Sequence, residues 1–177
     1  MTSLVHLLRR LNDRVAMGVG IVLLVCVAFT LVEIITRKLG AGLGGVDEIS
    51  GYVMAVTTAW GISYALTEQA HVRIDLLRQR LVPFGRAVFD VISMACLAGT
   101  AIVVAWRGWG VLEKTLSTGA RANTPLETPL WIPQTLWWLG WVWFAMSATI
   151  LLVSVAVRFA TSDYKSVDQI AGARGEA

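Results

Sequence analysis

Four long stretches of the chain contain no charged residue, and the charges cluster in the short segments between them. A helix needs about 20 largely apolar residues to cross the hydrocarbon core of a bilayer. Because proline is poorly tolerated inside a helix but is accommodated at its start, we begin the last span after Pro133. The pattern predicts transmembrane helices at about residues 15–35, 48–67, 87–107 and 134–157.

The composition agrees with a membrane protein. Of the 177 residues, 56% are hydrophobic and only 15% are charged, and the mean hydropathy is +0.65. Soluble domains are about 45–50% apolar and about 25% charged, and disordered chains combine low hydrophobicity with high net charge. We therefore predict an all-α integral membrane protein in which residues 1–177 form one four-helix membrane domain.

Lysine and arginine are unevenly distributed between the two sides of this predicted bundle. The N-terminus, the loop between the second and third spans, and the C-terminal tail contain ten of the 15 Lys and Arg residues. Cytoplasmic segments are enriched in these residues, which predicts that both termini are cytoplasmic. Five tryptophans then lie toward the outer surface, where we expect them to anchor at the lipid headgroups; they are Trp106, Trp109, Trp131, Trp137 and Trp138.

The predicted cytoplasmic loop between the second and third spans alternates charged and apolar residues. Within residues 72–81, the apolar side chains Ile74, Leu77 and Leu81 recur at helical spacing. Such a segment is compatible with a short interfacial helix whose arginines lie near anionic headgroups, or with an ordinary solvated loop. Pro83 limits any helix here to about three turns.

Ionisable residues inside a span are candidates for function, because their burial is costly. Glu33 and Asp90 lie near span ends, where they can reach headgroups or water, and no span centre carries a charge. Motifs of hydrolases, P-loop proteins and metalloproteases do not occur, and the two cysteines and two histidines have no metal-ligand spacing. We therefore expect a protein that is not an enzyme, with no catalytic residue, no cofactor, no metal and no nucleic-acid partner.

Small residues recur every four positions along the second span. This small-residue stripe consists of Gly51, Ala55, Ala59 and Ser63, with Trp60 beside it near mid-span. In lipid, small residues let helix backbones approach closely, and van der Waals packing contributes to helix association. The stripe is a candidate helix-packing surface, either within the chain's own bundle or against a larger partner.

Short motifs on both sides of the second span resemble those of a known family. An acidic pair precedes the span, and the loop after it reads H-x-R-x-D; the residues concerned are Asp47, Glu48, His71, Arg73 and Asp75. A proline-and-tryptophan segment, residues 129–133, precedes the fourth span. Together with the length and the four spans, these motifs resemble the small membrane subunit, called DctQ-type, of TRAP (tripartite ATP-independent periplasmic) transporters.

This resemblance implies a small accessory permease subunit in the bacterial inner membrane. In that family, a periplasmic solute-binding protein delivers an organic acid to a membrane pair, whose large multi-span subunit holds the substrate and ion sites. The small subunit then extends the static scaffold for secondary, ion-gradient-driven uptake by symport. Residues in the outer loops are candidate contacts for the binding protein; they are Arg37, Lys38, Lys114 and Arg121.

A self-sufficient four-helix exporter that works as a homodimer is the alternative hypothesis. A proton-coupled exporter needs a buried carboxylate, and Glu33 is a poor candidate because it lies close to a helix end beside Arg37. Neighbouring genes for a large membrane protein and a secreted solute-binding protein would favour the TRAP hypothesis.

Overall fold

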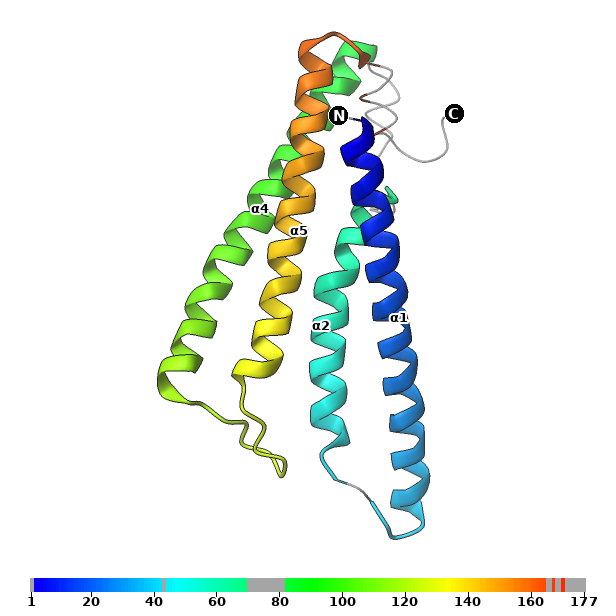
Figure 1. Cartoon of the computed structure of the whole chain (residues 1–177), viewed down its shortest axis with the longest axis vertical. Helices are drawn as coiled ribbons and strands as arrows, with labels where there is room; N and C mark the ends of the chain where they lie inside the picture. The colour runs from blue at the N-terminus through cyan, green and yellow to red at the C-terminus, as the bar shows by residue number, and fades with distance from the viewer. Residues whose placement is uncertain (1, 43, 70–81, 165–166, 168–169, 171–177) are drawn as a thin grey trace.

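The fold consists of long helices connected by short loops (Figure 1). The computed structural model describes residues 2–42, 44–69, 82–164, 167 and 170. Within these residues there are four long helices and no named β-strand; the helices are α1 (Thr2–Lys38), α2 (Val46–Thr67), α4 (Pro83–Thr118) and α5 (Trp131–Ala160). The predicted interfacial helix and the motif residues His71, Arg73 and Asp75 lie outside the described residues.

The helix α5 lies at the centre of the arrangement. It packs against α4 on one side and α2 on the other, while α1 packs mainly on α2 and touches α5 to a smaller extent. Small side chains fill much of the core, in which Ala98 and Ala101 of α4 and Ala148 of α5 are almost fully buried. The helices therefore form a row rather than a square bundle, as Figure 1 shows.

The two ends of the row differ in the segments that they contain. At the end that we call the terminal end, α1 begins and α5 ends (Figure 1). At the opposite end, which we call the loop end, residues 39–45 connect α1 to α2 and residues 119–130 connect α4 to α5. Both connections are short, so each joins antiparallel neighbours.

Three helices are long and apolar enough to cross a membrane, namely Leu4–Lys38 of α1, together with α4 and α5. The helix α2 is not among them, because glycine, serine, threonine and tyrosine residues lower its hydropathy. The structure thus supplies an all-helical membrane architecture with three long apolar helices, and the fourth span remains a prediction.

The helices extend beyond the predicted spans. The 37 residues of α1 correspond to about 55 Å of helix, which exceeds the roughly 30 Å hydrocarbon core of a bilayer. The extra turns at its start are not free in solution, since Val5 and Leu8 are buried in the core. The helix α5 begins at Trp131, which places Pro133 in its first turn, where a missing backbone N–H is tolerated.

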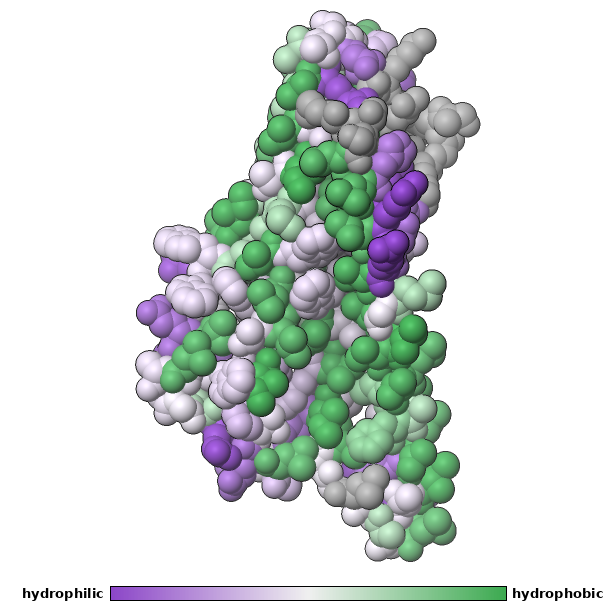
Figure 2. Space-filling view, viewed as in Figure 1, coloured by the Kyte–Doolittle hydropathy of each residue, from purple (hydrophilic) through white to green (hydrophobic). Residues whose placement is uncertain are grey.

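The part of α1 near the loop end exposes a nearly continuous apolar surface. Between residues 21 and 39, only Cys26 and Glu33 are buried. Exposed side chains in this part include Ile21, Leu24 and Ile35, and Figure 2 shows the resulting hydrophobic surface at the lower right of the molecule. Little of this part of α1 is therefore covered by the rest of the described chain.

Candidate partner interface

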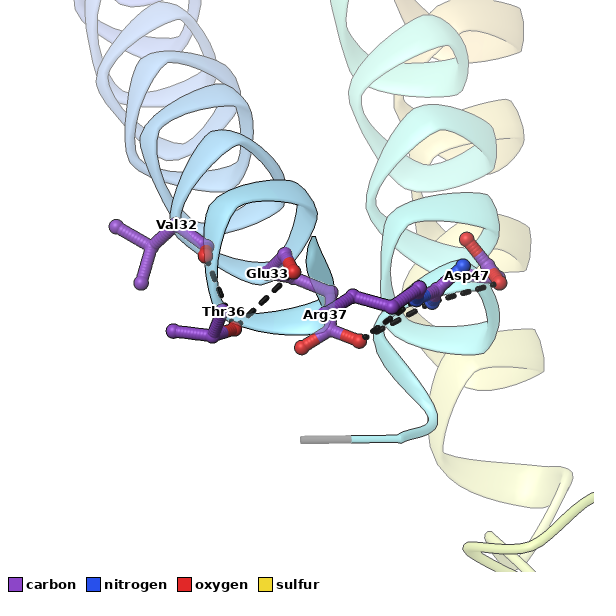
Figure 3. Close-up of polar contacts among 5 residues, drawn as sticks. All are labelled: Val32, Glu33, Thr36, Arg37 and Asp47. Carbon is purple, nitrogen blue, oxygen red and sulfur yellow. Dashed lines mark hydrogen bonds and ion pairs between the residues drawn. The ribbon is translucent and has the colours of Figure 1, made fainter. Parts of the chain in front are cut away.

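A chain of charges connects α1 to the first turn of α2 at the loop end (Figure 3). The Arg37 side chain donates to the Glu33 carboxylate through Nε at 3.2 Å and Nη2 at 3.1 Å. The same Nη2 lies 3.6 Å from a carboxylate oxygen of Asp47. Glu33 is only 2% exposed, so the guanidinium balances a carboxylate whose burial alone would be costly.

This arrangement changes the interpretation of two residues. We expected Glu33 to reach headgroups or water, whereas it is buried, because Arg37 lies four residues later on the same helix face and pairs with it. The Arg37 side chain is still 57% exposed. It can therefore meet a partner, but its guanidinium is already bound to Glu33 and Asp47.

Glu48, the second residue of the acidic pair Asp47–Glu48, accepts a hydrogen bond from the loop of residues 119–130. Tyr52 donates a hydrogen bond of 2.9 Å to Glu48 Oε1, and the Thr124 hydroxyl donates to Glu48 Oε2. Next to this contact, Leu126 lies against Gly45, where a Cβ atom would come within 2.5 Å of the leucine side chain. Gly45 also has a φ of +74°, a conformation that suits glycine.

The loop end is therefore an ordered surface on which basic side chains are displayed. Arg121 forms an isolated antiparallel bridge with Pro129 inside the loop. Its side chain and those of Lys38 and Lys114 are exposed. These three residues, together with Arg37, lie at or near one end of the molecule, as the predicted binding-protein contacts require.

The small-residue stripe on α2 is divided into two halves. Ala59 is 2% exposed and Ser63 is fully buried, and Ala59 packs so closely on Gly140 of α5 that a Cβ at position 140 would lie 2.9 Å from the Ala59 Cβ. Gly51 and Ala55, in contrast, are exposed. Within the described chain, the half nearer the terminal end packs in the bundle and the half nearer the loop end is uncovered.

Tryptophan side chains connect the helices through hydrogen bonds to backbone carbonyls. Trp60 Nε1 donates to the Leu136 carbonyl oxygen at 2.9 Å, which joins α2 to α5. Trp138 Nε1 donates to the Ala105 carbonyl oxygen at 2.8 Å, which joins α5 to α4. Trp138 therefore joins two helices, a role that the expected headgroup anchoring does not include. Trp106 and Trp131 are exposed, as an aromatic belt requires.

A polar cluster that the sequence analysis missed joins three helices. Asn12 of α1 is fully buried, and its Nδ2 donates to the Ser63 carbonyl oxygen at 3.3 Å and to Thr67 Oγ1 at 3.4 Å. Trp143 Nε1 of α5 donates to Asn12 Oδ1 at 2.8 Å. The available signal was weak, because Asn12 stands between Leu11 and Asp13 in a segment that also contains three arginines.

No described group of three His, Cys, Asp or Glu side chains has a geometry that could hold a metal ion. The described polar clusters instead hold helices and loops together, and the uncovered surfaces are helix faces. Such an architecture offers packing surfaces for other proteins.

Comparison with known families identifies the chain. The family model for the DctQ component of tripartite ATP-independent periplasmic transporters matches residues 26–160. The chain belongs to the DctQ family. Neither a curated protein nor a solved structure gives a match. The resemblance found around the acidic pair of α2 is thereby confirmed.

Membership of the DctQ family identifies the chain as a component of a transporter and not as a member of an enzyme family. The family belongs to tripartite systems that also contain a large membrane subunit and a periplasmic binding protein. The match begins within α1 and continues to the last residue of α5, so all four helices lie wholly or partly inside it.

Proposed function

We propose that the chain is the small accessory permease subunit that scaffolds the large subunit of a TRAP transporter. The transporter takes up an organic acid, delivered by a periplasmic binding protein, by ion-gradient-driven symport across the bacterial inner membrane. The observation that carries this proposal is the uncovered apolar surface of α1 between residues 21 and 39, next to the uncovered half of α2. A component of a tripartite transporter has a membrane partner that can cover such a surface.

The composition of α2 supports a protein partner there in preference to lipid. Its uncovered half presents Gly51, Ala55 and Thr58, and α2 lacks the long apolar stretch that each of the other three helices contains. Small residues permit close approach of a second helix, whereas they offer lipid chains little apolar surface. We assign this surface to the large subunit, and the basic side chains of the loop end to the binding protein.

The substitution Ala55→Leu should weaken capture of the large subunit. Ala59, by contrast, already packs against Gly140 of the same chain, so a substitution at position 59 would disturb the packing of α2 on α5 before it affected a partner. A leucine at position 55 inserts three heavy atoms into a close helix contact. Overpacking typically costs about 1–3 kcal/mol, which corresponds to about fivefold to 150-fold in affinity. The measurement is the yield of large subunit on an affinity-tagged small subunit.

The matched control is Ala95→Leu, at an exposed alanine of α4 on the other side of the row. It should leave the yield unchanged. Normal capture by a folded Ala55→Leu variant, combined with loss of capture by Ala95→Leu, would place the large subunit on α4 and contradict the assignment.

The purified chain alone should transport nothing in liposomes, with or without an ion gradient. Uptake should require the large subunit and the binding protein as well, because the centres of the predicted spans carry no charge that could couple an ion gradient to transport. The measurement is accumulation of a labelled organic acid in proteoliposomes with each component omitted in turn. Proton-driven transport by the chain alone, abolished by Glu33→Gln, would instead establish the exporter hypothesis.

A further inference from the structure

A pocket of about 490 Å³ lies at the terminal end, between the first turns of α4 and the residues that follow α5. Its polar lining comes from Arg86 and Asp90 on α4 and from Ser162, Asp163 and Tyr164 after α5. The volume lies within the range of about 300–1,000 Å³ that is typical of small-ligand sites. The DctQ family match ends at residue 160, so three of the seven lining residues lie beyond it.

The lining carries charges of both signs. Arg86 and Asp90 are four residues apart, on one face of α4, and Asp163 lines the same pocket from a different segment. Each of the three side chains already has an interaction within the protein, so a ligand would use the donors and acceptors that remain on them. Guanidinium groups bind phosphate oxygens through several N–H donors, and carboxylates accept hydrogen bonds from an ammonium group. A ligand with a phosphate and a primary ammonium would therefore match this lining better than a ligand with one charge.

An aromatic cluster lies beside the pocket and extends to the surface of the molecule. The ring centroids of Phe84 and Phe159 are 5.7 Å apart, and those of Phe84 and Tyr164 are 6.0 Å apart. Phe84 is 55% exposed and the preceding Val82 is 69% exposed. Apolar surface next to a charged pocket suits an amphipathic ligand, since its tail can lie on the rings while its head enters the pocket.

We propose that this pocket binds the headgroup of a phospholipid that carries a primary ammonium, such as phosphatidylethanolamine. Arg86 contacts the phosphate, Asp90 and Asp163 accept hydrogen bonds from the ammonium, and an acyl chain lies against Phe84. The uneven distribution of Lys and Arg puts this end at the cytoplasmic leaflet. The site requires only that the chain spans a membrane, and it is independent of how the chain contacts the large subunit.

Lipid retention measured by native mass spectrometry tests the site directly. The full-length chain is purified in detergent with equal amounts of phosphatidylethanolamine and phosphatidylcholine that have identical acyl chains. The expected result is about threefold to tenfold more bound phosphatidylethanolamine, because the trimethylammonium group of phosphatidylcholine has no N–H to donate. Equal retention of the two lipids by the unmodified chain would overturn the proposal.

The substitution Asp163→Asn should reduce this preference to near unity, because it removes an acceptor for the ammonium. Arg86→Gln should instead reduce the retention of both lipids, because the phosphate is common to both. The matched control is Glu113→Gln, an exposed carboxylate elsewhere on α4, which should leave the preference and the retention unchanged. Circular dichroism confirms that the variants are folded. A preference that persists in folded Asp163→Asn, or unchanged lipid retention by folded Arg86→Gln, would overturn the site. Soluble phosphoethanolamine should not displace the bound lipid at equal concentration; if it did, the pocket would bind the free headgroup and the lipid assignment would be wrong.

Discussion

Replacing Gly140 by leucine should force α2 away from α5 and lower the free energy of unfolding by roughly 3 kcal/mol or more, at the upper end of overpacking effects. A Cβ atom at this position would lie 2.9 Å from both the Ala59 Cβ and Trp60 Cδ1, and 3.0 Å from the Ala59 backbone carbonyl carbon. A flexible side chain can move aside, but a helix backbone cannot move without displacing its neighbours. The hydrogen bond from Trp60 to Leu136 should be lost at the same time.

The measurement is the midpoint of unfolding of the detergent-solubilised chain as a denaturing detergent is added, followed by circular dichroism. The matched control is Gly99→Leu, at a glycine of α4 where a Cβ atom would meet nothing within 4 Å. This control changes the same residue type inside a helix, and it should leave the midpoint nearly unchanged. Equal midpoints for the two variants would mean that α2 and α5 do not approach closely at position 140.

The existence of the helices could be predicted from the sequence, and their extent could not. Long charge-free stretches indicate helices in a membrane because few other structures satisfy the backbone there. The first turns of α1, in contrast, carry Arg9 and Arg10 and look like a solvated end. Their burial through Val5 and Leu8 depends on residues of other helices, and nothing in the local pattern indicates that contact.

In the candidate interface, too, contacts within one helix could be predicted from the sequence, whereas contacts between helices could not. The spacing of Glu33 and Arg37 is that of neighbours on one helix face, so their pairing could be inferred locally. The contact of Arg37 with Asp47 requires the connection between α1 and α2 to fold back. Likewise, the recurrence of small residues on α2 indicates a packing surface, but the local pattern does not show that Ala59 packs on Gly140 of α5 whereas Ala55 is exposed.

The polar cluster around Asn12 should be a second strong determinant of stability. Asn12→Ala removes the acceptor of the Trp143 indole N–H and the donor to Ser63 and Thr67, so several half-buried or buried polar groups lose a partner. Leaving a buried polar group unsatisfied costs about 1–3 kcal/mol. We expect a loss of this size in the free energy of unfolding, measured by the same detergent titration.

Trp143→Phe should have a smaller effect, because it removes the indole N–H while keeping most of the ring. The matched control is Trp131→Phe, at a tryptophan that is 46% exposed, which should be close to neutral. The double variant Asn12→Ala with Trp143→Phe should lose less stability than the two single variants together. The difference should be about 0.6 kcal/mol and at most about 1.7 kcal/mol, which are the average and the maximum measured for hydrogen bonds between helices in a membrane protein.

This double-variant comparison distinguishes a specific hydrogen bond from general packing. If Asn12 contributes only by filling space, its loss and the loss of the indole N–H will add independently, as they do for distant sites. Asn12 and Trp143 are 131 residues apart in the sequence, so coupling between them also requires α1 and α5 to pack side by side at this position. Strict additivity would therefore contradict both the hydrogen bond and the placement of the start of α1 against the rest of the bundle.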